Sequence, residues 1–501
     1  MNSLKHYDER NNLSHLWDAV LLPNALPALA GIVLGIVLAF LIARGSWLSA
    51  LAIVAASPAA VSLNKYPAAT ILLWFVLMPF LPVGNVPSPV LWVVHRALIP
   101  LGLGLNLLSR ILRTGKHSLV SWGLAEWSMV IYMILAIFSV LTTIKSPLLY
   151  IYQLYDRMFV AFTAYWLARF WSPDARALKR FIVPVIIVAI SEIVIGFWAK
   201  YAPHTLPSVW SFTRMGDRMS GTFSNPTPYA YTLILCMLLL FHYAQNVARG
   251  AFRVFLLFIF GAGMMCIFLT FTRGCWLSAI IVLIGLLIVY PKPTLVLIAI
   301  AVPIIASLAV TVLADEVVFA VQRLTIQETV DSRIVLAHAG KQMFYAKPIL
   351  GWGFGSYDRY DWQFLERIEG AVPTTWDVRH GTSHNTYLTI LAEMGVVGFL
   401  LQFLPLFLCF GATVRSWSQL PREGFWSRQL IASLWLSVVF YLISSQVIDM
   451  RFFWYQIGLF WLTLGLISSL VQTDWQSGAE HKDNNTLTDR STDAILRGNV
   501  I

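Results

Sequence analysis

The feature that most constrains the fold of this chain is a succession of apolar runs, each about 20 residues long and separated by short polar stretches. An α-helix of that length crosses the hydrocarbon core of a bilayer. Hydrophobic residues make up 58% of the 501 residues and charged residues only 12%, whereas an ordinary soluble domain is about 45–50% apolar. The sequence therefore predicts an all-α polytopic membrane protein.

The apolar runs predict about 12–14 transmembrane helices. The predicted spans are residues 25–43, 46–63, 67–83, 90–109, 124–144, 148–168, 181–199, 228–246, 252–271, 275–290, 294–313, 385–412, 429–447 and 453–471. Nothing before the first span has the form of a removable signal peptide, so the spans themselves are expected to direct the chain to the membrane.

The distribution of Lys and Arg between the spans predicts the orientation, because short cytoplasmic loops carry an excess of both. One set of alternate loops is basic and is expected in the cytoplasm: it carries Arg110, Arg113 and Lys116; Arg169, Arg176, Lys179 and Arg180; Arg249 and Arg253; Lys292; and Arg415, Arg422 and Arg428. The loops 200–227 and 314–384, the junction 272–274 and the turn 446–451 then face the outside.

The same orientation divides the chain into four parts. We expect a cytoplasmic N-terminal segment (1–24), N-terminal transmembrane helices (25–199), a transmembrane core with its external loop (200–472), and a cytoplasmic tail (473–501) whose polar composition is that of a disordered end.

Composition argues against several classes of function. The net charge is +10, but the basic residues are scattered between spans rather than gathered in a patch, so nucleic acid is not an expected partner. The four cysteines lie within apolar runs and show neither CxxC pairing nor metal-ligand spacing. We therefore predict no metal site and no cofactor.

The predicted external loop 314–384 is far longer than usual connections between packed helices. Apolar and aromatic residues occur throughout it, as in KPILGWGFGSYDRYDWQFLERIEG (347–370), so we expect an ordered cap on the bundle. Gly351, Gly353 and Gly355 permit tight turns, but no βαβ context makes them a dinucleotide fingerprint. The stretch DRYDWQFLERI predicts a short amphipathic helix near the interface.

Basic residues on a face that should contain few of them call for a functional explanation. The predicted outer face carries Arg214, Arg218, Arg273, Arg333 and His384. Contact with lipid phosphates is the simpler explanation for Arg214. Near His384, a helix N-cap explains the neighbouring Ser and Asn, but histidine is not a preferred cap.

Ionisable residues inside predicted spans are functional candidates by default. Arg157 and Glu192 lie mid-span, and a buried pair between them would serve packing equally well. Glu393 follows His384 on one helix but lies more than two turns deeper, which suits the orientation of neighbouring groups. Asp449 and Arg451, in a predicted external turn, would contact substrate or only each other.

Four stretches together resemble the O-antigen ligase and O-antigen polymerase family of bacterial inner-membrane glycosyltransferases. They are RMSGTFSNPTPYA (218–230), FTRGCWLSA (271–279), SRIVLAHAGKQMFYAKPILGWGFGSY (332–357) and SHNTYLTILAEMGVVG (383–398). The resemblance covers about residues 200–410 in the family's order and spacing.

The resemblance implies a glycosyltransferase-C-like architecture that uses an undecaprenyl-diphosphate-linked glycan as donor at the periplasmic face of the inner membrane. By position, Arg218 and Arg273 would bind the diphosphate and His384 would act on the acceptor. Further candidate substrate contacts are Arg333, Arg214, Asn385 and Tyr387.

The residue types suit that chemistry. Guanidinium groups bind diphosphate oxygens bidentately without a metal ion, and they stabilise charge on the leaving diphosphate. An imidazole with an ordinary pKa near 6.5 can take the proton of an acceptor hydroxyl. With no clear carboxylate pair, a single displacement with inversion is favoured over a covalent intermediate.

Three functions remain open on the sequence. The first is a glycan transferase: a polymerase, slightly favoured, acting on a glycan acceptor, or a ligase acting on lipid A-core. The second is a multi-span transporter, for example of bicarbonate, although no paired repeat is evident. The third is a non-catalytic flippase or scaffold. Expected partners are membrane lipids and other polysaccharide-assembly proteins, such as a flippase or a chain-length regulator.

Overall fold

The computed structural model describes residues 68–81, 92–112, 122–143, 147–171, 179–207, 210, 218–311, 313–325, 328–366, 368 and 383–472. These residues belong to two compact units, and the larger unit holds all of them except 68, 69 and 104–112. The predicted spans 25–43 and 46–63, the two predicted cytoplasmic ends and Arg214 lie outside the described residues.

The regular elements of the described residues are all helices, which confirms an all-α polytopic membrane protein. In chain order they are α4 (Ala68–Leu77), η2 (Met78–Phe80), η3 (Trp92–Ala97), α6 (Leu98–Leu112), α7 (Leu124–Thr143), α8 (Pro147–Leu154), η4 (Tyr155–Phe159), α9 (Val160–Trp171), α11 (Ile182–Tyr201), η5 (Pro203–Thr205), α13 (Pro226–Asn246), α14 (Gly250–Phe268), α15 (Arg273–Val289), α16 (Pro291–Thr311), α17 (Ala314–Thr325), α18 (Glu328–Ala346), α19 (Tyr357–Tyr360), η6 (Asp361–Phe364), α21 (Thr386–Ser416), α22 (Arg428–Ser444), η7 (Met450–Phe452) and α23 (Trp454–Gln472).

Every predicted span from residue 67 onwards overlaps helix in its described residues. Among the described residues, seven helices are long and apolar enough to cross a membrane, and four shorter apolar helices accompany them. The predicted span 148–168 is interrupted, because the π-helical turn η4 separates α8 from α9.

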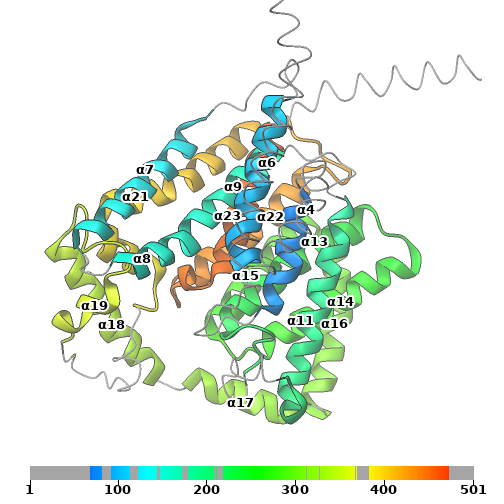
Figure 1. Cartoon of the computed structure of the whole chain (residues 1–501). Coiled ribbons are helices and arrows are strands. Elements are labelled where there is room, and N and C mark those ends of the chain that lie inside the picture. The colour runs from blue at the N-terminus through cyan, green and yellow to red at the C-terminus, as the bar shows by residue number, and fades with distance from the viewer. Residues whose placement is uncertain are drawn as a thin grey trace, which may run out of the picture. The chain divides into compact units, whose positions relative to one another are not determined.

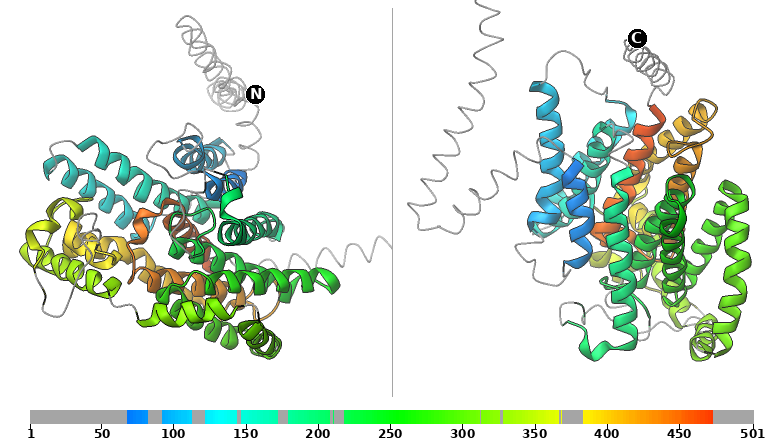
Figure 2. Two further views of the ribbon diagram at one scale, coloured as in Figure 1. Left: turned by 90° about the horizontal axis from the view of Figure 1, so that it is seen from below. Right: turned by 90° about the vertical axis from the view of Figure 1, so that its right-hand side faces the viewer.

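Helices α23 and α13 are the most buried of the candidate spans among the described residues, and α23 is red in Figure 2. Helix α23 packs along α9, and the two backbones come close because Gly465 has no side chain: a Cβ there would lie 2.4 Å from the carbonyl oxygen of Tyr165. Beside this contact, Trp461 meets the ring of Phe162 edge-on at 4.8 Å. Small residues at such crossings let apolar helices pack tightly in a membrane.

A second group of helices, α13, α14, α15 and α22, packs together (Figure 1), and several of their ends meet at one level. Helix α13 begins and α14 ends at this level, α15 begins a few residues later, and α22 ends there. Asn225 caps α13 by accepting a hydrogen bond from the amide of Thr227 at 2.9 Å. We call this level the site end of the larger unit.

Helix α21 is broken at Gly395, whose φ of 63° and ψ of −167° lie outside the helical range. The glycine-rich loop before α19 supplies replacement hydrogen bonds at the break. Gly353 donates to the carbonyl of Glu393 at 2.7 Å, and Val396 donates to the carbonyl of Pro348 at 2.8 Å. A break in an apolar helix persists only where other groups satisfy its backbone, so the loop and the break stabilise each other.

The described part of the predicted ordered loop 314–384 contains the helices α17 and α18, which the glycine-rich loop connects to α19. The predicted single amphipathic helix over DRYDWQFLERI is wrong in form: α19 ends at Tyr360 and a 3₁₀ turn, η6, follows it to Phe364. So short a helix is marginal by itself. Its shape is set by packing, because the rings of Tyr360 and Phe364 both contact Trp352.

Candidate functional site

The linker between α14 and α15 brings the first two predicted site residues together. Arg218 lies across this linker: its Nε donates to the carbonyl of Thr270 at 3.2 Å, and its Nη2 donates to Oγ1 of Thr272 at 2.6 Å. Arg273 is the next residue and begins α15. Two arginines that are far apart in sequence therefore meet at the site end.

Two further arginines contribute positive charge here. Burial, followed by the charges of Arg323 and Arg333, lowers the pKa of Arg218 to about 10. Burial and the charge of Arg273 likewise lower the pKa of Arg323. Guanidinium groups that depress one another's pKa values favour an anion among them. We call Arg218, Arg273, Arg323 and Arg333 the arginine cluster.

The backbone of the linker is held in an unusual conformation. Phe271 has a φ of 47°, which is rare for a residue with a side chain. Its buried ring meets Phe319 of α17 edge-on at 4.7 Å, and the Lys200 ammonium lies 5.2 Å from its ring centre. Lys200 also pairs with Glu316 at 3.7 Å. These contacts hold α17, and therefore Arg323, beside the linker.

His384 lies immediately before α21 and is the other described non-glycine residue with positive φ, at 49°. Asn385 follows as the N-cap, and its Oδ1 accepts hydrogen bonds from the amides of Tyr387 and Leu388. The Tyr387 hydroxyl donates to the carbonyl of Leu442 at 2.7 Å. The side chains of Asn385 and Tyr387 thus stabilise the start of α21, and Asn385 fixes the backbone that presents His384.

One turn, residues 444–448, connects the start of α21 with the start of α15. The amide of Thr386 donates to the carbonyl of Ser445 at 2.8 Å, and Oγ1 of Thr386 donates to the carbonyl of Ile448 at 3.1 Å. From the other element, Gly274 packs so closely that a Cβ would lie 2.6 Å from Val447. His384 and Arg273 therefore adjoin the same turn.

The remaining sequence candidates differ in position. Arg333 is exposed on α18, where it acts electrostatically on Arg218. Arg323 is not among the sequence candidates; it lies on α17 with its Nε buried and without a hydrogen-bond partner. On an amphipathic helix it resembles an ordinary solvated charge, so no local pattern marks it.

A second group of charged residues, Glu393, Asp449 and Arg451, is buried where α21 packs against η7. Arg451 donates from Nη1 to Glu393 at 2.9 Å and from Nη2 to Asp449 at 2.8 Å. The Arg451 side chain is 1% exposed, so both of its charged partners are needed to offset desolvation. These contacts fit the prediction that Glu393 orients neighbouring groups.

The proposed pairing of Arg157 with Glu192 is wrong. Glu192 accepts hydrogen bonds from the amide and hydroxyl of Thr222, at 3.1 and 2.6 Å. Arg157 instead lies over the ring of Phe452 at 3.9 Å. The π-helical turn that contains Arg157 changes the direction in which side chains leave the helix, and an apolar pattern does not encode that change.

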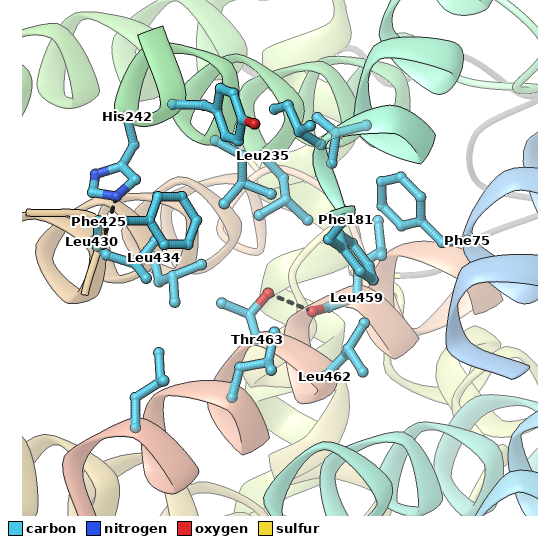
Figure 3. A pocket seen from close by; sticks show the side chains of 16 residues that line it. Phe75, Phe181, Leu235, His242, Phe425, Leu430, Leu434, Leu459, Leu462 and Thr463 are labelled. Carbon is cyan, nitrogen blue, oxygen red and sulfur yellow. Dashed lines mark hydrogen bonds between the residues drawn. The ribbon is translucent and has the colours of Figure 1, made fainter. Parts of the chain in front are cut away.

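A large apolar cavity lies away from these charges (Figure 3). It contains about 660 Å³ of empty space, open solvent included, and is lined by residues that include Phe181, His242, Phe425 and Leu459. His242 is near the end of α13, whereas Arg218 precedes its start. The cavity therefore provides no polar groups to the site end. Within the described residues, no group of three or more His, Cys, Asp or Glu side chains is placed to hold a metal ion.

Comparison with known proteins agrees with the motifs. Residues 255–403 match the family model described as O-antigen ligase, a range that includes Arg273, Arg323, Arg333 and His384. No curated protein matches the chain. The matched segment of the chain is therefore similar to O-antigen ligases.

Proposed function

We propose that this protein is a membrane glycosyltransferase that transfers an undecaprenyl-diphosphate-linked oligosaccharide to an acceptor at the periplasmic face of the bacterial inner membrane. A glycan acceptor, and hence polymerisation, is favoured over lipid A-core. The observation that carries the proposal is the arginine cluster, which adjoins the turn that also contacts the start of α21. The family match supports the class of reaction.

In this proposal the arginine cluster binds the diphosphate of the donor. The acceptor hydroxyl oxygen attacks the anomeric carbon while the bond from that carbon to the diphosphate oxygen breaks. The diphosphate leaves with the bonding electrons, and Arg218 and Arg273 stabilise its added charge. The His384 imidazole takes the hydroxyl proton. A single displacement of this kind inverts the anomeric centre.

The orientation proposed here rests on the distribution of basic residues between spans. Loops such as the one holding Arg415, Arg422 and Arg428 would face the cytoplasm. The arginine cluster and His384 would then face the periplasm, where lipid-linked glycans are presented after translocation.

The test is turnover by the full chain in detergent, supplied with lipid-diphosphate-linked oligosaccharide from its host. We expect chain growth and release of undecaprenyl diphosphate with EDTA present. His384→Ala and Arg273→Ala are each expected to lower kcat/KM by about 10²–10⁴. His204→Ala and Arg422→Ala change exposed residues outside the arginine cluster and the start of α21 and serve as matched controls.

The outcomes separate the competing functions. Growth of the glycan without lipid A-core indicates a polymerase, whereas release of lipid diphosphate only with lipid A-core indicates a ligase. Donor binding without turnover, unchanged in His384→Ala, would instead favour a flippase or scaffold. Bicarbonate uptake by proteoliposomes that neither bind nor turn over the lipid would favour a transporter.

A further inference from the structure

A small cavity lined by both polar and apolar groups adjoins the first turns of α21, on the side of the buried charges. Its lining residues are Gln153, Arg157, Gly355, Tyr357, Asp358, Thr389, Glu393 and Phe452. They come from η4 and α8, from the glycine-rich loop with α19, from α21, and from η7. Its empty volume of about 310 Å³ includes open solvent at its mouth, so one sugar ring is the upper limit for a ligand and would stay partly in solvent.

Arg157 is the cavity residue whose hydrogen-bonding groups are not all satisfied by the protein. The residue is 8% exposed, and its Nε is buried without a hydrogen-bond partner. The nearby carboxylates of Glu393 and Asp449 offset its charge, but both hydrogen-bond to Arg451 instead. A buried guanidinium nitrogen without a hydrogen bond is costly, so an oxygen acceptor placed in the cavity would stabilise Arg157.

The geometry of Arg157 is already fixed. Its guanidinium lies over the Phe452 ring at 3.9 Å, so little side-chain entropy remains to be lost when it binds a ligand. Gln153 and the exposed Asp358 complete the polar wall. Arg157 can only donate hydrogen bonds, Asp358 can only accept them, and the Gln153 amide can do both. Together they match a ring that carries several hydroxyl groups.

The position of the cavity relates it to the acceptor rather than to the diphosphate. Thr389 lines the cavity and hydrogen-bonds to Ser383, the residue before His384. The segment 447–452 connects the two sites. Its Val447 contacts Gly274, its Ile448 accepts a hydrogen bond from Thr386 at the start of α21, and its Phe452 lines the cavity. The start of α21 thus separates the cavity from the arginine cluster.

We propose that this cavity binds one hydroxyl-rich pyranose ring of the acceptor glycan, with Arg157 and Gln153 donating hydrogen bonds to ring oxygens and Asp358 accepting from ring hydroxyls. The proposal rests on the transferase function above and assigns its acceptor subsite. It requires no covalent step. Its consequence is that Gln153 and Asp358 affect recognition of the acceptor saccharide without affecting the diphosphate.

The experiment measures binding of a lipid-free saccharide, one repeat unit of the host's surface polysaccharide, to the detergent-solubilised full chain by saturation-transfer difference NMR. Gln153→Ala and Asp358→Asn are each expected to raise the apparent Kd about tenfold, as loss of one hydrogen bond does. Both side chains are at least partly exposed, so these variants should fold. Gln419→Ala and Glu423→Gln alter exposed residues far along the chain and are the matched controls.

Three results would overturn the proposal: no saccharide binding by wild type, wild-type affinity in both cavity variants, or displacement of the saccharide by excess undecaprenyl diphosphate. Weakened binding in the cavity variants alone supports the subsite. Because the measurement needs no turnover, it also separates the two proposals. Saccharide binding that depends on Gln153 and Asp358, in a protein that transfers nothing, would refute the transferase function but leave the saccharide site.

Discussion

Arg323 supplies part of the positive charge that the donor diphosphate would meet. Its Nε is buried without a hydrogen-bond partner, and the charge of Arg273 acts on it. A hydrogen bond to a charged group contributes about 1.5–3 kcal/mol. We therefore expect Arg323→Ala to raise the KM for the lipid-linked donor by about 10–100-fold, measured by steady-state release of lipid diphosphate.

The control for this prediction is Arg422→Ala, which removes an exposed arginine from a different loop. Arg323→Lys should recover only part of the affinity, because an ammonium does not bind a diphosphate bidentately. An unchanged donor KM in Arg323→Ala would remove this residue from the site.

Asp361 gives the loop around α19 a pH dependence. The residue is buried in η6, and burial raises its pKa to about 6. The folded state therefore retains a proton between pH 4 and 6 that the unfolded chain has lost, so stability falls as pH rises through this window. We expect Asp361→Asn to raise the melting temperature at pH 7.5 and to bring no gain at pH 4, in a thermal unfolding assay in detergent.

The matched control is Glu423→Gln, an exposed carboxylate in another loop. Equal melting temperatures for Asp361→Asn and wild type at both pH values would show that the carboxylate is solvated rather than buried.

At the scale of single residues, the candidate site residues that could be predicted were those whose type is unusual for their sequence surroundings. Arg273 stands between apolar runs and Arg218 next to a turn of small polar residues, so both were recognisable. Arg323 was not, because a charge on an amphipathic helix is ordinary. Asn385 and Tyr387 were candidates for substrate contact, and the structure gives both side chains backbone partners that stabilise α21.

At the scale of elements, the docking of the glycine-rich loop on the broken helix α21 depends on Gly351. A Cβ at this residue would lie 2.3 Å from the carbonyl carbon of Glu393, and its φ is 70°. We expect Gly351→Ala to destabilise the protein by about 1–3 kcal/mol and to speed proteolysis between residues 347 and 364. Thermal unfolding and limited digestion in detergent measure the two effects.

Gly411→Ala is the matched control. Gly411 lies in α21, the helix on which the loop docks, and a Cβ there would meet nothing within 4 Å. Alanine favours a helix interior by up to about 1 kcal/mol over glycine, so this variant should be as stable as wild type or more so. Equal behaviour of the two variants would contradict the docking described here.

The helices were predictable and their irregularities were not. Runs of about 20 apolar residues locate a span because the bilayer sets its length, and they gave α7, α11 and α14 closely. The break at Gly395 lies in the apolar stretch EMGVVG, and its backbone is satisfied by a loop some 45 residues earlier. Only the tertiary contact shows why the helix is interrupted there, and the same holds for the π-helical turn at Arg157.

At the scale of the whole molecule, the proposed chemistry requires α19 and the loop before α22 to lie on opposite sides of the membrane. The cysteines at 236, 266, 275 and 409 are buried, so a single introduced cysteine reports its own side. We expect Trp362→Cys, at a residue that is 66% exposed, to react with a membrane-impermeant maleimide in intact spheroplasts. Glu423→Cys should react only after the membrane is permeabilised.

This labelling decides which compartment supplies the substrate. If Trp362→Cys is the external position, the arginine cluster and His384 meet donors that have already crossed the membrane, since α17 and α18 connect the cluster to the same loop. If labelling is reversed, the positive charges counted between the spans do not control the topology. The site would then face the cytoplasm, and a periplasmic transfer reaction would be impossible for this chain. Unmodified protein, with its four buried cysteines, must remain unlabelled under both conditions for either result to count.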